Sequence, residues 1–155
     1  MSYATILATD RPMPELRYRA TQPVTLRSGR VSHEVSAGLF ILSHGFDLRR
    51  CRCDTKKTCY SFFHCGPVVS DLVLQAAKDY LGEHLAAGET AELWGIWQGE
   101  YPNERGELCF VEDYARANQS PIRRTVTLEQ LSLEDLSLLE DPGQGEQSVC
   151  ITVRR

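Results

Sequence analysis

The sequence lacks long apolar runs. None of its stretches approaches the roughly 18 uncharged apolar residues that a membrane-spanning helix needs. Residues 1–15 contain no basic segment followed by an apolar stretch of the length found in secretory signals. We therefore expect a protein that neither crosses a membrane nor enters the secretory route, and we place it in the cytoplasm.

Positive charge is also in short supply. Lysine and arginine number 17 against 21 acidic residues, which gives a net charge of −4. Because proteins that hold a nucleic-acid backbone usually have a basic balance, nucleic acid is not an expected partner. Hydrophobic residues at 42% and charged residues at 25% are ordinary values for a globular protein. The 155 residues are expected to form one domain, 1–155.

Cysteine is too scarce for a disulfide scaffold. The 6 cysteines fall well below the roughly 8–10% typical of such scaffolds, so in the cytoplasm they are expected to be reduced thiols. The sequence also lacks a glycine-rich phosphate loop, a Gly-x-Ser-x-Gly nucleophile elbow and paired histidines at helical spacing. We therefore expect no cofactor, and none of these enzyme classes is indicated.

The residues that are present predict an α+β fold. Helical spacing of apolar residues from Val73 to Leu85 predicts a helix that ends by Gly88. A capping box formed by Ser132 and Asp135 predicts a second, shorter helix. A β-hairpin is expected over 46–65, with its turn at 54–57. Apolar and β-branched segments predict strands over residues 3–9, 24–26, 35–42, 58–65, 91–97, 124–128 and 149–153. The connection over 98–121 is expected to contain at most one short strand, 108–111.

From residue 58 onward the expected order is strand, helix, strand, strand, helix, strand. This βαββαβ order is that of a ferredoxin-like core, here about 58–155, in which two helices cover one face of a mostly antiparallel sheet. Residues 1–57 would form an N-terminal β extension that lengthens the sheet or covers its other face. In the last strand, Val149, Ile151 and Val153 are expected to face the helices.

One tryptophan is expected on the face of the sheet that the helices leave open. Because side chains alternate along a strand, either Trp94 with Ile96 or Leu93 with Trp97 must point to that face. We expect this tryptophan to be buried under the N-terminal strands rather than exposed as a stacking platform for RNA.

Cysteines gather around the turn of the expected hairpin. Cys51, Cys53 and Cys59 could lie on one face near the turn, where thiolates could hold zinc or another soft metal. Cys65 cannot join them, because the intervening strand separates it from Cys59 by about 20 Å. The alternative is that these cysteines are small buried apolar side chains.

A second candidate site is the pair His64 and Cys65, followed by Gly66 and Pro67. If a helix begins at Pro67, Cys65 lies beside its N-terminus, where the helix dipole favours a thiolate nucleophile. His64 could assist only if the strand breaks at this point, because neighbours on a strand point to opposite faces. The pattern does not fit cysteine phosphatases, since Asp71 stands where their arginine would be. The alternative is a strand-end cysteine packed beneath the helix.

The long connection over 98–121 carries side chains that are favoured at interfaces. The leading hypothesis is a small cytosolic binding or regulatory protein that recognises a protein or a small ligand and has no catalysis of its own. The alternatives are a small enzyme with Cys65 as its nucleophile and a cysteine-based metal-binding module. The residues expected to bind are Trp97, Tyr101, Arg105 and Tyr114.

Overall fold

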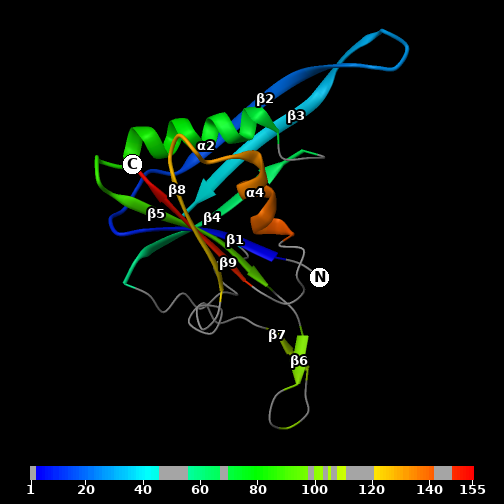
Figure 1. Ribbon diagram of the computed structural model, residues 1–155. Coiled ribbons are helices and arrows are strands. Elements are labelled where there is room, and N and C mark those ends of the chain that lie inside the picture. Colours follow the sequence, from blue (N-terminus) through cyan, green and yellow to red (C-terminus); the bar gives the residue numbers. More distant parts are fainter. Residues whose placement is uncertain are drawn as a thin grey trace.

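The computed structural model describes residues 3–45, 56–66, 70–97, 100–102, 105, 108–110, 121–141 and 148–155. In these ranges the chain is an α+β protein in which a seven-stranded sheet packs against two helices (Figure 1). The strands of the sheet are β1 (Tyr3–Thr9), β2 (Leu16–Thr25), β3 (Val31–Leu42), β4 (Thr58–Cys65), β5 (Thr90–Trp97), β8 (Ile122–Thr127) and β9 (Val149–Arg154). The helices are α2 (Asp71–His84) and α4 (Leu133–Glu140), and a separate ladder joins β6 (Glu100–Pro102) to β7 (Leu108–Phe110).

The strand order of the sheet is β2-β3-β4-β1-β5-β9-β8. Every neighbouring pair is antiparallel except β8 and β9, which are parallel. The first strand, β1, lies in the middle, and its residues Ala4, Ile6 and Leu7 are fully buried. A strand that is buried on both faces has a nearly continuous apolar sequence, as residues 3–9 do.

The ferredoxin-like arrangement expected for residues 58–155 is confirmed in part. The sheet is mostly antiparallel and both described helices lie on one face, but the strand order differs. The sheet is larger than that core, because β1, β2 and β3 belong to it. The strands that α4 connects, β8 and β9, are direct parallel neighbours, whereas a split βαβ unit keeps another strand between them. The physical reason is that β1 lies between β4 and β5. β9 therefore pairs with the other edge of β5, and β8 pairs with the other edge of β9.

The N-terminal strands lengthen the sheet instead of covering its other face. β2 and β3 form a long two-stranded ribbon that projects from the body of the molecule (Figure 1). Both strands are longer than expected. β2 is the edge strand of the sheet, and an edge strand tolerates Pro23 and the polar residues that interrupt the apolar pattern. The part of the expected hairpin over 58–65 is β4, which pairs with β3 and β1. Residues 46–55 lie outside the described residues.

The first helix, α2, packs on the sheet through the residues whose spacing predicted it. Val73, Ala77, Tyr80 and Leu81 are its buried residues. The helix ends before Gly88, whose φ of 84° is a conformation that favours glycine. Neither helix in the described part of the chain has the length and apolar character needed to cross a membrane.

The capping box predicted at the start of α4 is confirmed. The Ser132 N–H donates to Asp135 Oδ2 at 2.9 Å, and the Asp135 N–H donates to Ser132 Oγ at 3.3 Å. Asp135 is fully buried and also pairs with Arg124 of β8 at 2.9 Å. At its other end α4 lies close against β5, because Gly95 has no Cβ that would overlap the backbone of Leu139.

Apolar side chains are buried on both faces of the sheet. The larger cluster lies between the sheet and the helices and includes Val149, Ile151 and Val153, as predicted. The smaller cluster lies on the opposite face and includes Trp94 and Ile96, which decides between the two alternatives for that strand. Trp94 is 1% exposed, so it is buried as expected. However, β2 and β3 do not cover it, because they lie in the same sheet.

Candidate functional site

The face of the sheet opposite α2 and α4 carries a row of arginine and aromatic side chains on β2, β3 and β4. Because side chains alternate along β2, Arg17 and Arg19 point away from α2. The strand register places Arg17 opposite Phe40, and Phe40 opposite Phe63. We call Arg17, Arg19, Phe40 and Phe63 the arginine–aromatic face.

The geometry of the arginine–aromatic face is closely defined. The rings of Phe40 and Phe63 are stacked, with centroids 5.0 Å apart and planes at 13°. The guanidinium carbon of Arg19 lies 5.3 Å from the centroid of Phe40, a cation–π distance. Gly38 leaves room for this arrangement, since a Cβ there would come within 2.7 Å of Cys65 Sγ and 3.0 Å of the Phe40 ring. Phe63 is 38% exposed, whereas Phe40 is buried.

A polar cluster surrounds Trp94 on the same face. Trp94 Nε1 donates to Glu92 at 2.9 Å, and the guanidinium carbon of Arg123 lies 5.5 Å from the centroid of the indole. Lys57 Nζ is 3.1 Å from Glu92. Burial raises the pKa of Cys150 to about 11, and the charge of Glu92 adds to this effect. A thiol with such a pKa stays protonated at neutral pH and is a poor nucleophile.

The structure does not bring His64 and Cys65 together. β4 continues through Cys65, which pairs with Gly38, so the two side chains point to opposite faces. His64 faces α4, with its Nε2 at 2.7 Å from Glu140 Oε1 and its side chain 12% exposed. Cys65 lies on the face opposite α2 and α4, against Gly38. The next described helix, α2, begins at Asp71 with Ser70 as its N-cap, whereas the thiolate hypothesis depends on a helix that begins at Pro67.

The structure describes one of the three cysteines considered for a metal site. Cys51 and Cys53 lie outside the described residues, whereas Cys59 is half-buried at the start of β4. Its Sγ donates to the carbonyl oxygen of Lys57 at 3.8 Å. Within the described ranges, no three histidine, cysteine, aspartate or glutamate side chains are grouped so that they could hold a metal ion. The proposed cysteine site therefore stays a prediction.

The long connection after β5 is described in part. Trp97 is the last residue of β5, and Tyr101 pairs with Cys109 in the β6–β7 ladder. Arg105 is exposed between these two short strands. Tyr114 lies outside the described residues. A binding role for these four predicted residues remains a prediction.

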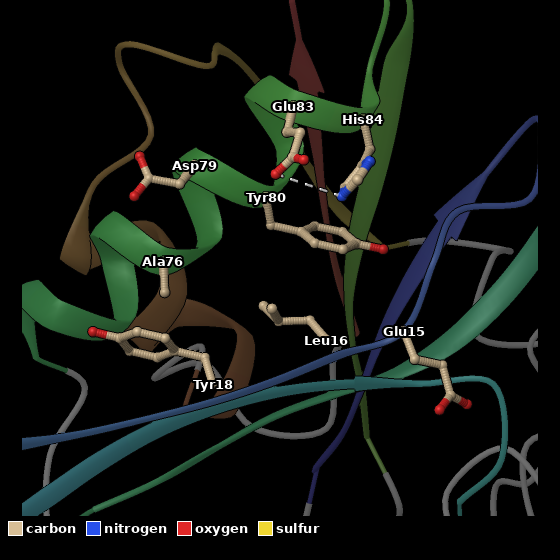
Figure 2. A pocket seen from close by; sticks show the side chains of 8 residues that line it. All are labelled: Glu15, Leu16, Tyr18, Ala76, Asp79, Tyr80, Glu83 and His84. Atoms are coloured by element: carbon tan, nitrogen blue, oxygen red, sulfur yellow. Dashed lines mark ion pairs between the residues drawn. The ribbon is translucent and has the colours of Figure 1, made fainter.

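A hollow that the sequence did not indicate lies between β2 and α2 (Figure 2). Figure 2 shows Ala76 and Tyr80 of α2 across from Leu16 and Tyr18 of β2, so apolar groups form its walls. The hollow has a volume of about 180 Å³ and is lined by Glu15, Leu16, Tyr18, Ala76, Asp79, Tyr80, Glu83 and His84.

Three carboxylates stand around this hollow. Glu15 accepts hydrogen bonds from the N–H and the hydroxyl of Ser43, and these bonds lower the pKa of Glu15. Asp79 accepts from Gln75 Nε2 at 2.7 Å, and Glu83 is largely exposed. The spacing of Asp79 and Glu83 could have indicated an acidic helix face. Glu15 joins them only through the packing of β2 beneath α2.

Comparisons with models of known families, with curated proteins and with solved structures found no match to this chain. The function is therefore inferred from the chemistry of the described surfaces.

Proposed function

We propose that this chain is a small cytoplasmic binding protein that recognises a partner protein through the arginine–aromatic face and has no catalysis of its own. The observation that carries the proposal is the exposed ring of Phe63, which is stacked on Phe40 beside the guanidinium of Arg19.

This arrangement has the chemistry of an interface anchor. Aromatic and arginine side chains contribute most of the binding energy at many protein interfaces. Because the stack already restricts Phe63, and Arg19 already lies over a ring, little rotamer freedom would be lost on binding. The matching surface of the partner would offer an apolar pocket for Phe63 and a carboxylate for Arg17 or Arg19.

Two features favour binding over cysteine catalysis. His64 lies on the face of β4 opposite to Cys65, so it is not placed to take the proton of that thiol. Cys150 is buried and its pKa is raised to about 11. The residues proposed for additional contacts to the partner are Trp97, Tyr101, Arg105 and Tyr114.

The proposal is tested by affinity capture followed by a binary binding measurement. Wild-type protein and the variants Phe63→Ser, Arg19→Ala and Arg154→Ala are immobilised, and proteins captured from a cytoplasmic extract are quantified by mass spectrometry. Arg154 is an exposed arginine outside the arginine–aromatic face and is the matched control. We expect the partner to be retained by wild type and Arg154→Ala and lost from the other two. The Kd of the purified pair should then rise at least about tenfold in those two variants.

Equal retention of every captured protein by all four chains would show that this face is not the binding surface. The three substituted side chains are exposed, so the variants are expected to fold, and far-UV circular dichroism checks this.

A further inference from the structure

The ribbon of β2 and β3 concentrates positive charge in an acidic chain. Residues 16–37 contain four arginines and one glutamate, which gives a charge of +3. Since the whole chain carries −4, the remaining residues carry −7. Such an uneven distribution gives the molecule two regions of opposite potential, and regions of this kind attract one another between molecules.

The end of the ribbon also exposes apolar side chains. We call residues 26–31, which connect β2 to β3 and include the first residue of β3, the ribbon tip. Leu26 and Val31 are 49% and 54% exposed, and Arg27 and Arg30 beside them are exposed as well. Gly29, with φ of 75°, closes the turn, and no heavy atom lies within 4 Å of the position that a Cβ would take there. The ribbon tip therefore presents two apolar and two cationic side chains to solvent.

The hollow between β2 and α2 has the complementary chemistry. Its walls are formed by apolar groups, and Asp79 and Glu83 of α2 supply its carboxylates. Glu15 also lines the hollow, but its carboxylate points away from α2 and accepts hydrogen bonds from Ser43. An arginine side chain suits such a place, because its methylene stem packs on apolar surface while its guanidinium pairs with a carboxylate. The hollow and the ribbon tip thus match in both charge and apolar character.

The ribbon tip cannot reach the hollow of its own molecule. The hollow contacts β2 at Leu16 and Tyr18, and the tip begins at Leu26 of the same strand. At about 3.3 Å per residue, the strand separates Tyr18 from Leu26 by about 26 Å. A tip that occupies the hollow must therefore belong to another molecule.

We propose that the ribbon tip of one molecule docks into the hollow of a second copy of this chain. Leu26 and Val31 contact its apolar walls, and Arg27 and Arg30 lie beside its carboxylates. A two-stranded ribbon is only marginally stable in water, so docking also stabilises its end. A reciprocal exchange of two tips closes a dimer, whereas a one-way contact propagates into an open chain. This surface shares no residue with the arginine–aromatic face, so either proposal can fail alone.

The first test is sedimentation velocity of the full chain over a range of concentrations. We expect species larger than the 17.5 kDa monomer, and their fraction should fall when salt is raised. Between about 0.1 M and about 1 M salt the screening length falls from about 10 Å to about 3 Å. A chain that stays monomeric at every concentration in low salt would overturn the proposal.

The second test reverses the charges one side at a time. The tip variant combines Arg27→Glu with Arg30→Glu, and the hollow variant combines Asp79→Lys with Glu83→Lys. Each variant alone should associate at least about tenfold more weakly than wild type, because like charges then meet. The single reversals Arg154→Glu and Glu129→Lys, at exposed positions outside both surfaces, are the matched controls and should associate as wild type does.

Mixing the tip variant with the hollow variant distinguishes docking from a loss of structure. In the mixture a native tip meets a native hollow, and a negative tip meets a positive hollow, so association should return. Association unaffected by either reversal would overturn the proposal. So would a mixture of two folded variants that stays monomeric, with folding verified by circular dichroism.

Discussion

Asp135 is the buried carboxylate on which the start of α4 depends. It accepts hydrogen bonds from the N–H and the hydroxyl of Ser132 and pairs with Arg124. Asp135→Ala removes these acceptors, so we expect the free energy of unfolding to fall by about 2–4 kcal/mol. Urea unfolding measures this change. Glu134→Ala, in the same turn but exposed, should change it by less than about 0.5 kcal/mol, and equal losses would contradict the role of Asp135.

The ionisation of Glu89 should change the free energy of unfolding at acid pH. The hydrogen bond from Arg11, followed by that from the Ala86 N–H, lowers the pKa of Glu89 to about 2. Its ordinary value is 4.5, so the folded state binds the proton less tightly than the unfolded state does. Ionised Glu89 therefore stabilises the fold above about pH 4.5, and this contribution is lost as the pH falls toward about 2.

We accordingly expect Glu89→Gln to have a lower Tm than wild type near neutral pH. The difference in Tm should shrink as the pH is lowered from about 4.5 to about 2, because protonation of Glu89 removes its contribution from the wild type. The other carboxylates titrate in both proteins, so their effect cancels in the difference. Thermal unfolding followed by circular dichroism at several pH values measures it. A difference that does not vary with pH would show that the charge of Glu89 is not its cause.

The described cysteines should differ in reactivity according to their burial. Cys150 is fully buried, and its pKa is raised to about 11, whereas Cys59 and Cys65 are half-buried. In the folded protein, iodoacetamide should modify Cys150 at least about tenfold more slowly than it does in denaturant. Peptide mass spectrometry gives the rates. Rapid modification of Cys150 in the folded state would contradict its burial.

The same samples test the alternative that Cys65 is a catalytic nucleophile. Such a thiol would react faster at about pH 6.5 than an ordinary thiol with a pKa of about 8.5. If Cys65 reacts no faster than a model thiol, the cysteine-enzyme hypothesis is removed.

At the level of elements, β9 is an interior strand although it lies near the end of the chain. It pairs with β5 on one side and β8 on the other, and Val149, Ile151 and Val153 are fully buried against the helices. Ile151→Ala should therefore lower the free energy of unfolding by about 2–5 kcal/mol. Deletion of residues 147–155 should give insoluble or molten protein.

Urea unfolding checks Ile151→Ala against Arg154→Ala, an exposed substitution in the same strand that should cost less than about 0.5 kcal/mol. A truncated chain that melts cooperatively at the temperature of the full chain would mean that β9 does not belong to the sheet.

For the molecule as a whole, the number of free thiols and the metal content together test the cysteine-based metal site. Protein purified without chelator is expected to contain 6 titratable thiols and no stoichiometric metal, because free cysteines are most often small buried apolar side chains. Elemental analysis combined with native mass spectrometry decides this. A stoichiometric metal that is lost in Cys53→Ser would instead establish the metal module around Cys51, Cys53 and Cys59.

The arginine–aromatic face illustrates why candidate sites were harder to predict than elements. Arg19, Phe40 and Phe63 come from three strands, and they meet only because β2, β3 and β4 pair in one register. The hollow depends in the same way on α2 covering β2. Residues proposed from adjacency in the chain, His64 and Cys65, were separated instead, because neighbours on a strand point to opposite faces.

Local spacing was enough to identify α2, the capping box of α4 and the two faces of β9. Each of these depends on residues two to four positions apart, a separation at which side chains of one element already share a face. Strand order could not be found in this way. β1 entered between β4 and β5, and β8 paired in parallel with β9, through competition among backbone pairings between distant segments. The most stable strand order is the one that buries most apolar surface on both faces of the sheet. Its free energy depends on the whole set of strands rather than on any one of them.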